Sequence, residues 1–141
     1  MILDEGWSVK YAGDLLKVIP EIDLPELLRY AKGRNVGIIL WAGYHAIERD
    51  MEHVVKHYAA MGVKGFKVDF LDRDDQKMID FMYRLADICA QHHMLLDYHG
   101  CCKPSGLQRT YPNVLNYEAV FGLEQMKWTS SKTDMVCLLY T

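Results

Sequence analysis

The chain has 141 residues, half of them hydrophobic and a quarter charged, and its formal net charge is −3. This composition is typical of a folded globular domain and argues against intrinsic disorder. The lack of a basic excess disfavours a nucleic-acid partner, and no apolar run approaches the roughly 18 residues that a membrane-spanning helix needs. The first ten residues carry no basic segment ahead of an apolar core, so they do not resemble a secretory signal peptide.

The first predicted elements are a strand and a helix. Residues 1–6, "MILDEG", are apolar at their start and polar at their end, which indicates a short strand. Residues 22–35 show helical spacing, with Asp23 as the expected N-cap, Glu26 three residues later and Gly33 as the expected stop. The apolar face of this helix carries Leu24, Leu27, Leu28 and Ala31.

Further strands and helices alternate along the rest of the chain. They are predicted strands at residues 36–43, 65–70, 94–100 and 113–120 and predicted helices at residues 48–62 and 74–93. The apolar residues of both helices recur at helical spacing and should face inward. They are Met51, Val54, Val55 and Tyr58 in the first helix and Met78, Phe81, Met82, Leu85, Ile88 and Cys89 in the second. Strands that alternate with helices predict an α/β fold with a parallel sheet.

The number of strands leaves two architectures open. The first four predicted strands recur about every 30 residues, close to the repeat of a (β/α)8 barrel, but such a barrel needs about 250 residues. Five strands could form a complete doubly wound domain or one piece of a barrel.

Polar and aromatic residues gather at the carboxyl ends of the predicted strands. They are Asp4, Glu5 and Trp7; Trp41; Lys67 and Asp69; Asp97 and His99; and Asn116 and Glu118. In α/β proteins this edge of the sheet binds ligands. A structural ion pair between Lys67 and Asp69 would explain one strand, but the recurrence over five strands favours a binding site.

The stretch "GFKVDF" carries the strongest signal. Lys67 and Asp69 stand two residues apart and therefore point to the same side of the strand. Burying an unpaired charge is costly, so we expect both side chains to serve a polar ligand. The nearby aromatic residues Trp7, Trp41 and Tyr98 suggest that this ligand is a sugar.

Glycoside hydrolysis needs two carboxyl groups, one on either side of the bond that is cleaved. Asp69 is one candidate, and Glu118 and Glu124 are candidates on a different strand and its following loop. The sequence contains no G-x-G-x-x-G or P-loop motif and no C-x-x-C spacing among its four cysteines, so neither a nucleotide nor a zinc site is supported.

Several segments together resemble the catalytic barrel of glycoside hydrolase family 97. These are "ILDEGWS", "DLPELLRYAKGRNVGIILW", "GFKVDF", "YHGCCKPSGLQRTYPNVLNYEAVFGLE" and "KW", which span residues 2 to 128. The resemblance implies a partial (β/α)8 TIM barrel of about five consecutive βα units, barrel strands 2 to 6. Residues 1–141 would then be a fragment that lacks an N-terminal β-sandwich, the first and last barrel strands and a C-terminal β domain.

The same resemblance implies the reaction. One branch of the family contains retaining α-galactosidases, with an Asp nucleophile on the fourth barrel strand, where this chain has Asp69. The other contains inverting α-glucosidases, with a Glu base directly after the His of the fifth strand, where this chain has Gly100 after His99. The resemblance therefore implies a retaining α-galactosidase. The alternatives are an inverting α-glucosidase or a non-catalytic, sugar-binding or inactive barrel fragment.

Roles for individual residues follow from the resemblance. Asp69 would be the nucleophile and Glu124 the general acid/base, while Glu118 and Glu124 would hold a calcium ion, Ca2+. Lys67 and His99 would bind sugar hydroxyls, and weaker candidates for substrate binding are Asp4, Trp41, Lys103 and Arg109. On electrostatic grounds we also expect Lys67 to lower the pKa of Asp69.

The expected partner is an oligosaccharide or another α-galactoside. An incomplete barrel would expose two sheet edges, which predicts self-association of the isolated chain. The resemblance further implies a bacterial parent protein that is periplasmic or exported.

Overall fold

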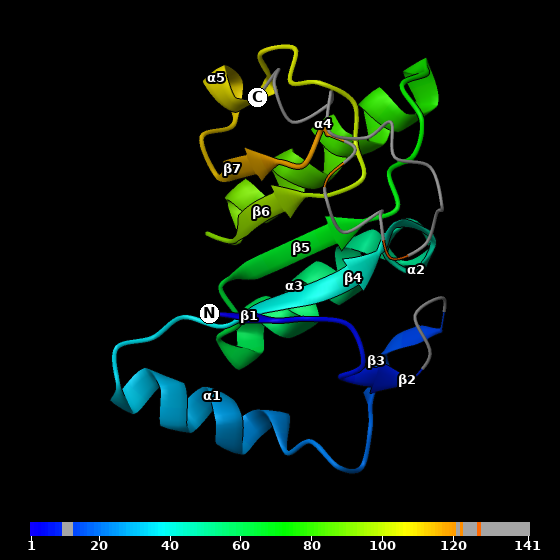
Figure 1. The fold of residues 1–141 in the computed structure, drawn as a ribbon. Coiled ribbons are helices and arrows are strands. Elements are labelled where there is room, and N and C mark those ends of the chain that lie inside the picture. Colours follow the sequence, from blue (N-terminus) through cyan, green and yellow to red (C-terminus); the bar gives the residue numbers. More distant parts are fainter. Residues whose placement is uncertain (10–12, 121, 123–126, 128–141) are drawn as a thin grey trace.

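The computed structural model describes residues 1–9, 13–120, 122 and 127 (Figure 1). Its strands are β1 (Ile2–Leu3), β2 (Ser8–Val9), β3 (Asp14–Val18), β4 (Ile39–Gly43), β5 (Gly65–Asp69), β6 (Leu95–Tyr98) and β7 (Val114–Tyr117). Its helices are α1 (Leu24–Gly33), α2 (Tyr44–Arg49), α3 (Met51–Met61), α4 (Gln76–Gln91) and α5 (Leu107–Thr110). None of the helices described is long and apolar enough to cross a membrane.

The main sheet is parallel, with its strands in the order β1-β4-β5-β6-β7. Each strand therefore pairs with the next main-sheet strand along the chain, as the sequence predicts. The short strands β2 and β3 form a separate antiparallel hairpin, which was not predicted. Trp7 ties this hairpin region to the sheet, since its Nε1 donates to the carbonyl of Trp41 at 2.8 Å.

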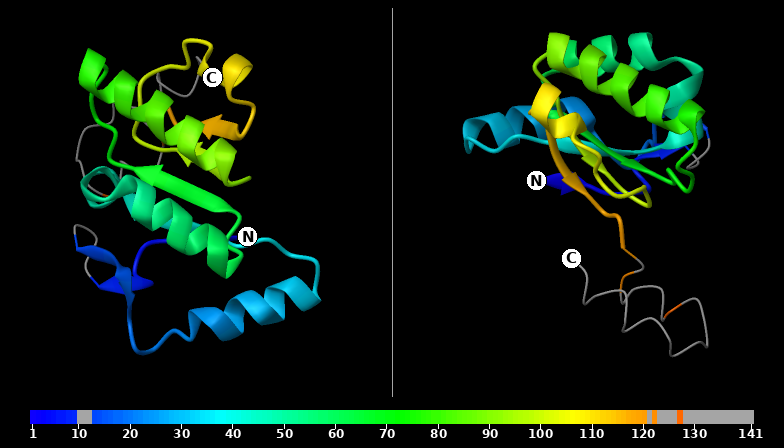
Figure 2. Two further views of the ribbon diagram at one scale, coloured as in Figure 1. Left: turned by 180° about the vertical axis from the view of Figure 1, so that it is seen from behind. Right: turned by 90° about the horizontal axis from the view of Figure 1, so that it is seen from above.

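The helices cover one side of the sheet. Figure 2 shows α1, α3 and α4 together on that side, and no described helix lies on the other. Side chains alternate accordingly: Phe66, Val68, Leu96 and Tyr98 are fully buried against the helical layer. The intervening side chains of β5 and β6, including Lys67 and Asp97, lie on the other face and are partly exposed. A sheet with helices on one side differs from a doubly wound domain, which carries helices on both.

The register aligns the polar residues in one row across the sheet. Trp41 pairs with Lys67, Lys67 with Asp97, and Asp97 with Asn116. One step further along, Gly43 pairs with Asp69. Because the strands are parallel and run in sequential order, their carboxyl ends meet at one edge.

Local signals set the helix boundaries. The Asp23 side chain accepts a hydrogen bond from the Glu26 backbone and is the N-cap of α1, as predicted. The Asp75 side chain caps α4 in the same way, and Gly62 ends α3 with a left-handed φ of 96°. α1 ends at Gly33, as predicted, but Gly33 is itself helical and the left-handed residue is Asn35.

The predicted helix at residues 48–62 is two helices in the structure. α2 occupies Tyr44–Arg49, and the helix is interrupted at Asp50, which has an extended φ of −149°. The inward residues predicted for α3 and α4 are buried, apart from Ile88, which is partly buried. The hydrophobic core therefore lies between the sheet and its single helical layer.

Candidate active site

The Asp69 carboxylate is held from two sides at the end of β5. The indole Nε1 of Trp41 donates to its Oδ2 at 3.0 Å, and the backbone N–H of Phe70 donates to its Oδ1 at 2.8 Å. Trp41 is 2% exposed, so its ring is buried and holds the carboxylate in place. Two donors therefore fix the orientation of this carboxylate, as a positioned nucleophile requires.

Lys67 pairs with Asp4 rather than with Asp69. Its Nζ lies 2.8 Å from Asp4 Oδ2, and the Lys67 side chain is 14% exposed. Burial opposes the charge on Lys67, but the hydrogen bond and charge of Asp4 outweigh it and raise the pKa of Lys67. Burial likewise opposes the charge on Asp4, whose pKa is nevertheless lowered by the hydrogen bonds from Lys67 and the Glu5 backbone. The structural ion pair between Lys67 and Asp69, which was the alternative to a binding site, does not form.

His99 lies between two carboxylates. Its Nε2 is 3.2 Å from both carboxylate oxygens of Asp97, and its Nδ1 is 3.2 Å from Oε2 of Glu118. The hydrogen bond and charge of Asp97, with the charge of Glu118, raise the pKa of His99. Burial opposes the charge on Asp97, but His99 and the Asn116 amide, which donates at 3.1 Å, keep its pKa below the ordinary value. The network links the ends of β6 and β7.

Gly100 leaves an opening next to Asp69. Its backbone N–H donates to Oε2 of Glu118 at 3.2 Å, and its φ of 53° lies in the left-handed region. A Cβ at this position would lie 3.5 Å from Oδ1 of Asp69 and 3.0 Å from Oδ1 of Asp72. A Cβ here would press on Asp72 and touch Asp69, so glycine leaves the space beside Asp69 free.

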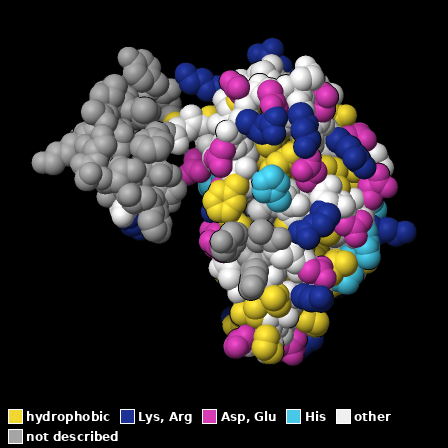
Figure 3. Space-filling model, turned by 90° about the vertical axis from the view of Figure 1, so that its right-hand side faces the viewer, with side chains coloured by type: hydrophobic (Ala, Val, Ile, Leu, Met, Phe, Trp, Pro, Cys, Tyr) yellow, Lys and Arg dark blue, Asp and Glu magenta, His cyan; other side chains and the backbone are white. Residues whose placement is uncertain are grey.

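A cavity of about 670 Å³ adjoins this opening. It is lined by Leu71, Asp72, Arg73, Asp74, Ile79, Gly100, Cys101, Cys102, Lys103 and Ser105. Ligand pockets commonly measure roughly 300–1,000 Å³. Figure 3 views the side toward which the strands point, where acidic, basic and histidine side chains gather around apolar ones.

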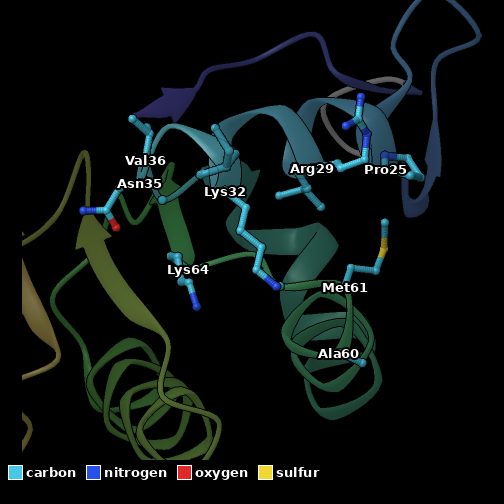
Figure 4. Close-up of a pocket in the computed structure, with 12 residues that line it drawn as sticks. Pro25, Arg29, Lys32, Asn35, Val36, Ala60, Met61 and Lys64 are labelled. Carbon is cyan, nitrogen blue, oxygen red and sulfur yellow. The ribbon is translucent and has the colours of Figure 1, made fainter.

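A second cavity, also of about 670 Å³, lies between α1 and α3 at the opposite ends of the strands (Figure 4). Lys32, Met61 and Lys64 are among its lining residues, and it contains none of the predicted site residues. In parallel α/β folds this end usually serves stability rather than ligand binding. The polar strand ends are therefore the better candidate site.

The structure brings together most of the predicted residues that it describes. Asp4 pairs with Lys67, and Trp41, the cross-strand neighbour of Lys67, bonds Asp69. His99 contacts both Asp97 and Glu118 and joins them in a second group. Lys103 lines the adjoining cavity. Arg109 is exposed on α5 and forms no side-chain hydrogen bond or ion pair with these groups within the described residues. Glu124 lies outside the described residues.

Three further residues at this edge were not predicted as site residues. Asp97 was noted only as a polar strand end, although the period of two along β6 puts it on the same face as His99. Asp72 lies near Gly100, where a Cβ would be 3.0 Å from its Oδ1, and no sequence pattern reveals that approach. Phe70 looks like an ordinary apolar strand residue in the sequence, yet it is exposed.

Glu118 suits a calcium site by its chemistry, because Ca2+ takes oxygen ligands, and carboxylates are common among them. Its Oε2 contacts the Gly100 N–H and His99, whereas no hydrogen bond to Oε1 occurs among the residues described. That part of the chain also contains no group of three or more His, Cys, Asp or Glu side chains that could hold a metal ion. Glu118 is one fitting ligand, and a complete site would need others.

The family model described as Glycoside hydrolase 97 matches residues 1–120. The chain belongs to glycoside hydrolase family 97. The match covers the main sheet, its helices and every described residue of the candidate site. Family membership agrees with the resemblance seen in the sequence.

Two curated proteins resemble this chain. A retaining alpha-galactosidase from Bacteroides thetaiotaomicron is 65% identical over 136 residues, which cover 96% of this chain and 20% of that protein. A probable retaining alpha-galactosidase from Streptomyces bingchenggensis is 36% identical over 104 residues, which cover 72% of this chain and 16% of that protein. The chain thus spans about a fifth of the length of these relatives.

The solved structure of a family 97 enzyme from Pseudoalteromonas sp. strain K8 in complex with panose superposes with a TM-score of 0.73. The two chains are 21% identical, and the match covers 88% of this chain and 23% of that one. The likeness establishes a shared fold.

Proposed function

We propose that this chain carries the nucleophile of a retaining α-galactosidase of family 97. The observation that carries the proposal is the Asp69 carboxylate, which is held ready by Trp41 and Phe70 beside an opening that Gly100 leaves free. The 65% identity to the Bacteroides retaining alpha-galactosidase supports the same reaction and substrate.

The reaction would proceed in two displacements. An Asp69 oxygen attacks the anomeric carbon, the bond to the leaving oxygen breaks, and the general acid gives its proton to that oxygen. The residue that acted as general acid then takes a proton from water. The water oxygen attacks the anomeric carbon, which releases galactose and the Asp69 carboxylate. We assign the acid/base role to Glu124, whose carboxyl group should then lie about 5–5.5 Å from that of Asp69.

The paired polar groups would orient the sugar. The Lys67 ammonium donates one proton to Asp4 and has no second hydrogen-bond partner among the described residues, so its other protons could bind ring hydroxyls. The His99 ring is fixed by Asp97 and Glu118. Lys103, in the adjoining cavity, is a further candidate for substrate binding. We keep calcium as a proposed cofactor with Glu118 and Glu124 as ligands, where a bound ion would position sugar hydroxyls.

The architecture of the whole enzyme is part of the proposal. A sequential parallel sheet with helices on one side fits barrel strands 2 to 6 of a (β/α)8 barrel, and the chain matches only 20% of the Bacteroides relative. We expect the other barrel strands and the flanking β domains to complete the protein, and we expect a periplasmic or exported bacterial enzyme. Without them, the outer edges of β1 and β7 would be open to self-association.

The main alternative is an inverting α-glucosidase of the same family. That mechanism needs a second carboxylate as the base, with room for water between it and the sugar. The position after His99, which the inverting branch fills with glutamate, is Gly100, and this disfavours the alternative. A non-catalytic sugar-binding role would require that the intact protein lack hydrolytic activity.

Chemical rescue tests the role of Asp69. In the longer enzyme that includes this chain, Asp69→Ala should reduce hydrolysis of aryl α-galactosides by at least about 10³-fold, because the covalent step loses its nucleophile. Added azide should restore turnover and yield β-galactosyl azide, since azide attacks from the vacated side.

Asp80→Ala is the matched control, because Asp80 is an exposed aspartate on α4 whose side chain bonds Gln76. It should leave turnover unchanged. Rescue that yields α-galactosyl azide, or full activity of Asp69→Ala, would remove Asp69 from the nucleophile role.

A further inference from the structure

Phe70 is an exposed and conformationally unusual residue next to the proposed nucleophile. It is 47% exposed although its side chain is large and apolar. Its φ of 66° lies in the left-handed region, which bulky side chains rarely occupy because the Cβ crowds the backbone. Neither feature stabilises the fold, and strained backbone of this kind concentrates at functional sites.

The contacts of Phe70 place its ring at the site. Its backbone N–H donates to Oδ1 of Asp69, and its ring meets the Trp41 ring edge to face, with 5.7 Å between centroids. Trp41 in turn donates to the other oxygen of Asp69. The aromatic pair therefore borders the carboxylate directly.

The bond to Asp69 does not explain why residue 70 is aromatic. A backbone N–H is present in every residue except proline, and glycine or asparagine would adopt the left-handed conformation more easily. Packing within the described part of the chain does not explain it either, because almost half of the residue is exposed there. The ring must therefore be explained by something that contacts its exposed face.

We propose that the exposed face of Phe70 is a sugar-binding platform, which packs against the C–H groups of the pyranose that Asp69 attacks. This inference rests on the proposed function. Pyranose rings carry hydroxyls on their edge and C–H groups on a face, and a rigid aromatic ring covers such a face with little loss of conformational freedom. Lys67 and His99 supply the polar contacts, and Phe70 supplies the apolar one that they lack.

The test removes the ring while keeping the bond to Asp69. Phe70→Gly and Phe70→Asn both retain the backbone N–H and favour the left-handed φ, so the melting temperature of the longer enzyme should stay the same or rise. The KM for an aryl α-galactoside should increase about tenfold or more, with a smaller change in kcat, because a binding surface for the sugar is lost. Phe70→Trp should keep a KM close to that of the unmodified enzyme.

Tyr30→Ala is the matched control, since Tyr30 is an exposed aromatic residue on α1, away from the site. It should leave KM unchanged. An unmodified enzyme that hydrolyses α-galactosides while Phe70→Gly keeps its KM would overturn the platform and leave the proposed function standing. If Phe70→Gly and Phe70→Trp raise KM equally, an aromatic face at this position does not bind the sugar, and this result would also overturn the platform. An unmodified enzyme without activity on α-galactosides would remove both proposals together.

Discussion

Lys67 joins the end of β5 to Asp4, which follows β1, and this pair links two strands that are not neighbours. In the sequence Lys67 and Asp69 stand out because both interrupt an apolar strand, and their common face could be predicted from the period of two. The partner of Lys67 could not be predicted, because Asp4 is distant in the chain and approaches only when β4 pairs with both β1 and β5. The sequence therefore identifies the charged residues but not which of them form ion pairs.

The ion pair between Asp4 and Lys67 should contribute modestly to stability. Because the Asp4 side chain is 60% exposed, we expect a coupling free energy of about 0.5–1 kcal/mol at neutral pH. The comparison is a double-mutant cycle of Asp4→Asn and Lys67→Met, with the free energy of unfolding measured by urea titration. Tyr30→Phe, which leaves the pair untouched, is a control that should not alter the coupling.

The coupling should depend on pH in a defined direction. The folded pKa of Asp4 is lowered from 3.8, so the pair contributes fully above that value and is lost as the pH falls through the folded pKa. The folded pKa of Lys67 is raised from 10.5, so its contribution is complete below that value and is lost as the pH rises through the folded pKa. A coupling that persists well below pH 3.8 would contradict the ion pair.

At the scale of elements, capping residues and helical spacing were reliable guides. Asp23 caps α1 as predicted, and the apolar spacing of α4 gives its buried face. The break at Asp50 and the short helix α5 were missed, because single-turn helices carry too few residues to show a period. The hairpin of β2 and β3 was missed for the same reason, since strands of two and five residues give little alternation.

The cap of α4 offers a test at this scale. The Asp75 side chain accepts a hydrogen bond from the Met78 backbone at 3.1 Å, so Asp75→Ala should lower the free energy of unfolding by about 1 kcal/mol. Thermal or urea unfolding measures this change, with Asp80→Ala as a control within about 0.5 kcal/mol of the unmodified chain. Equal stability of the two variants would show that Asp75 contributes no cap.

For the whole molecule, the sequential order of the parallel strands could be predicted from the alternation of strands and helices. Whether helices would cover one side of the sheet or both could not, because the buried faces of Phe66 and Tyr98 look the same in the sequence in either case. The convergence of Asp69, His99 and Glu118 at one edge follows from the parallel sheet, but the contacts of Phe70 and Asp72 depend on how the chain turns after β5.

The central claim is that the enzyme retains the configuration at the anomeric carbon, with Asp69 as the nucleophile. Proton NMR of the first sugar released from an aryl α-galactoside by the longer enzyme tests this most directly, because two displacements restore the original configuration. We expect α-galactose to appear first and β-galactose to accumulate only later, at the rate of spontaneous mutarotation. If β-galactose is released first, the enzyme inverts the centre and Asp69 is not its nucleophile.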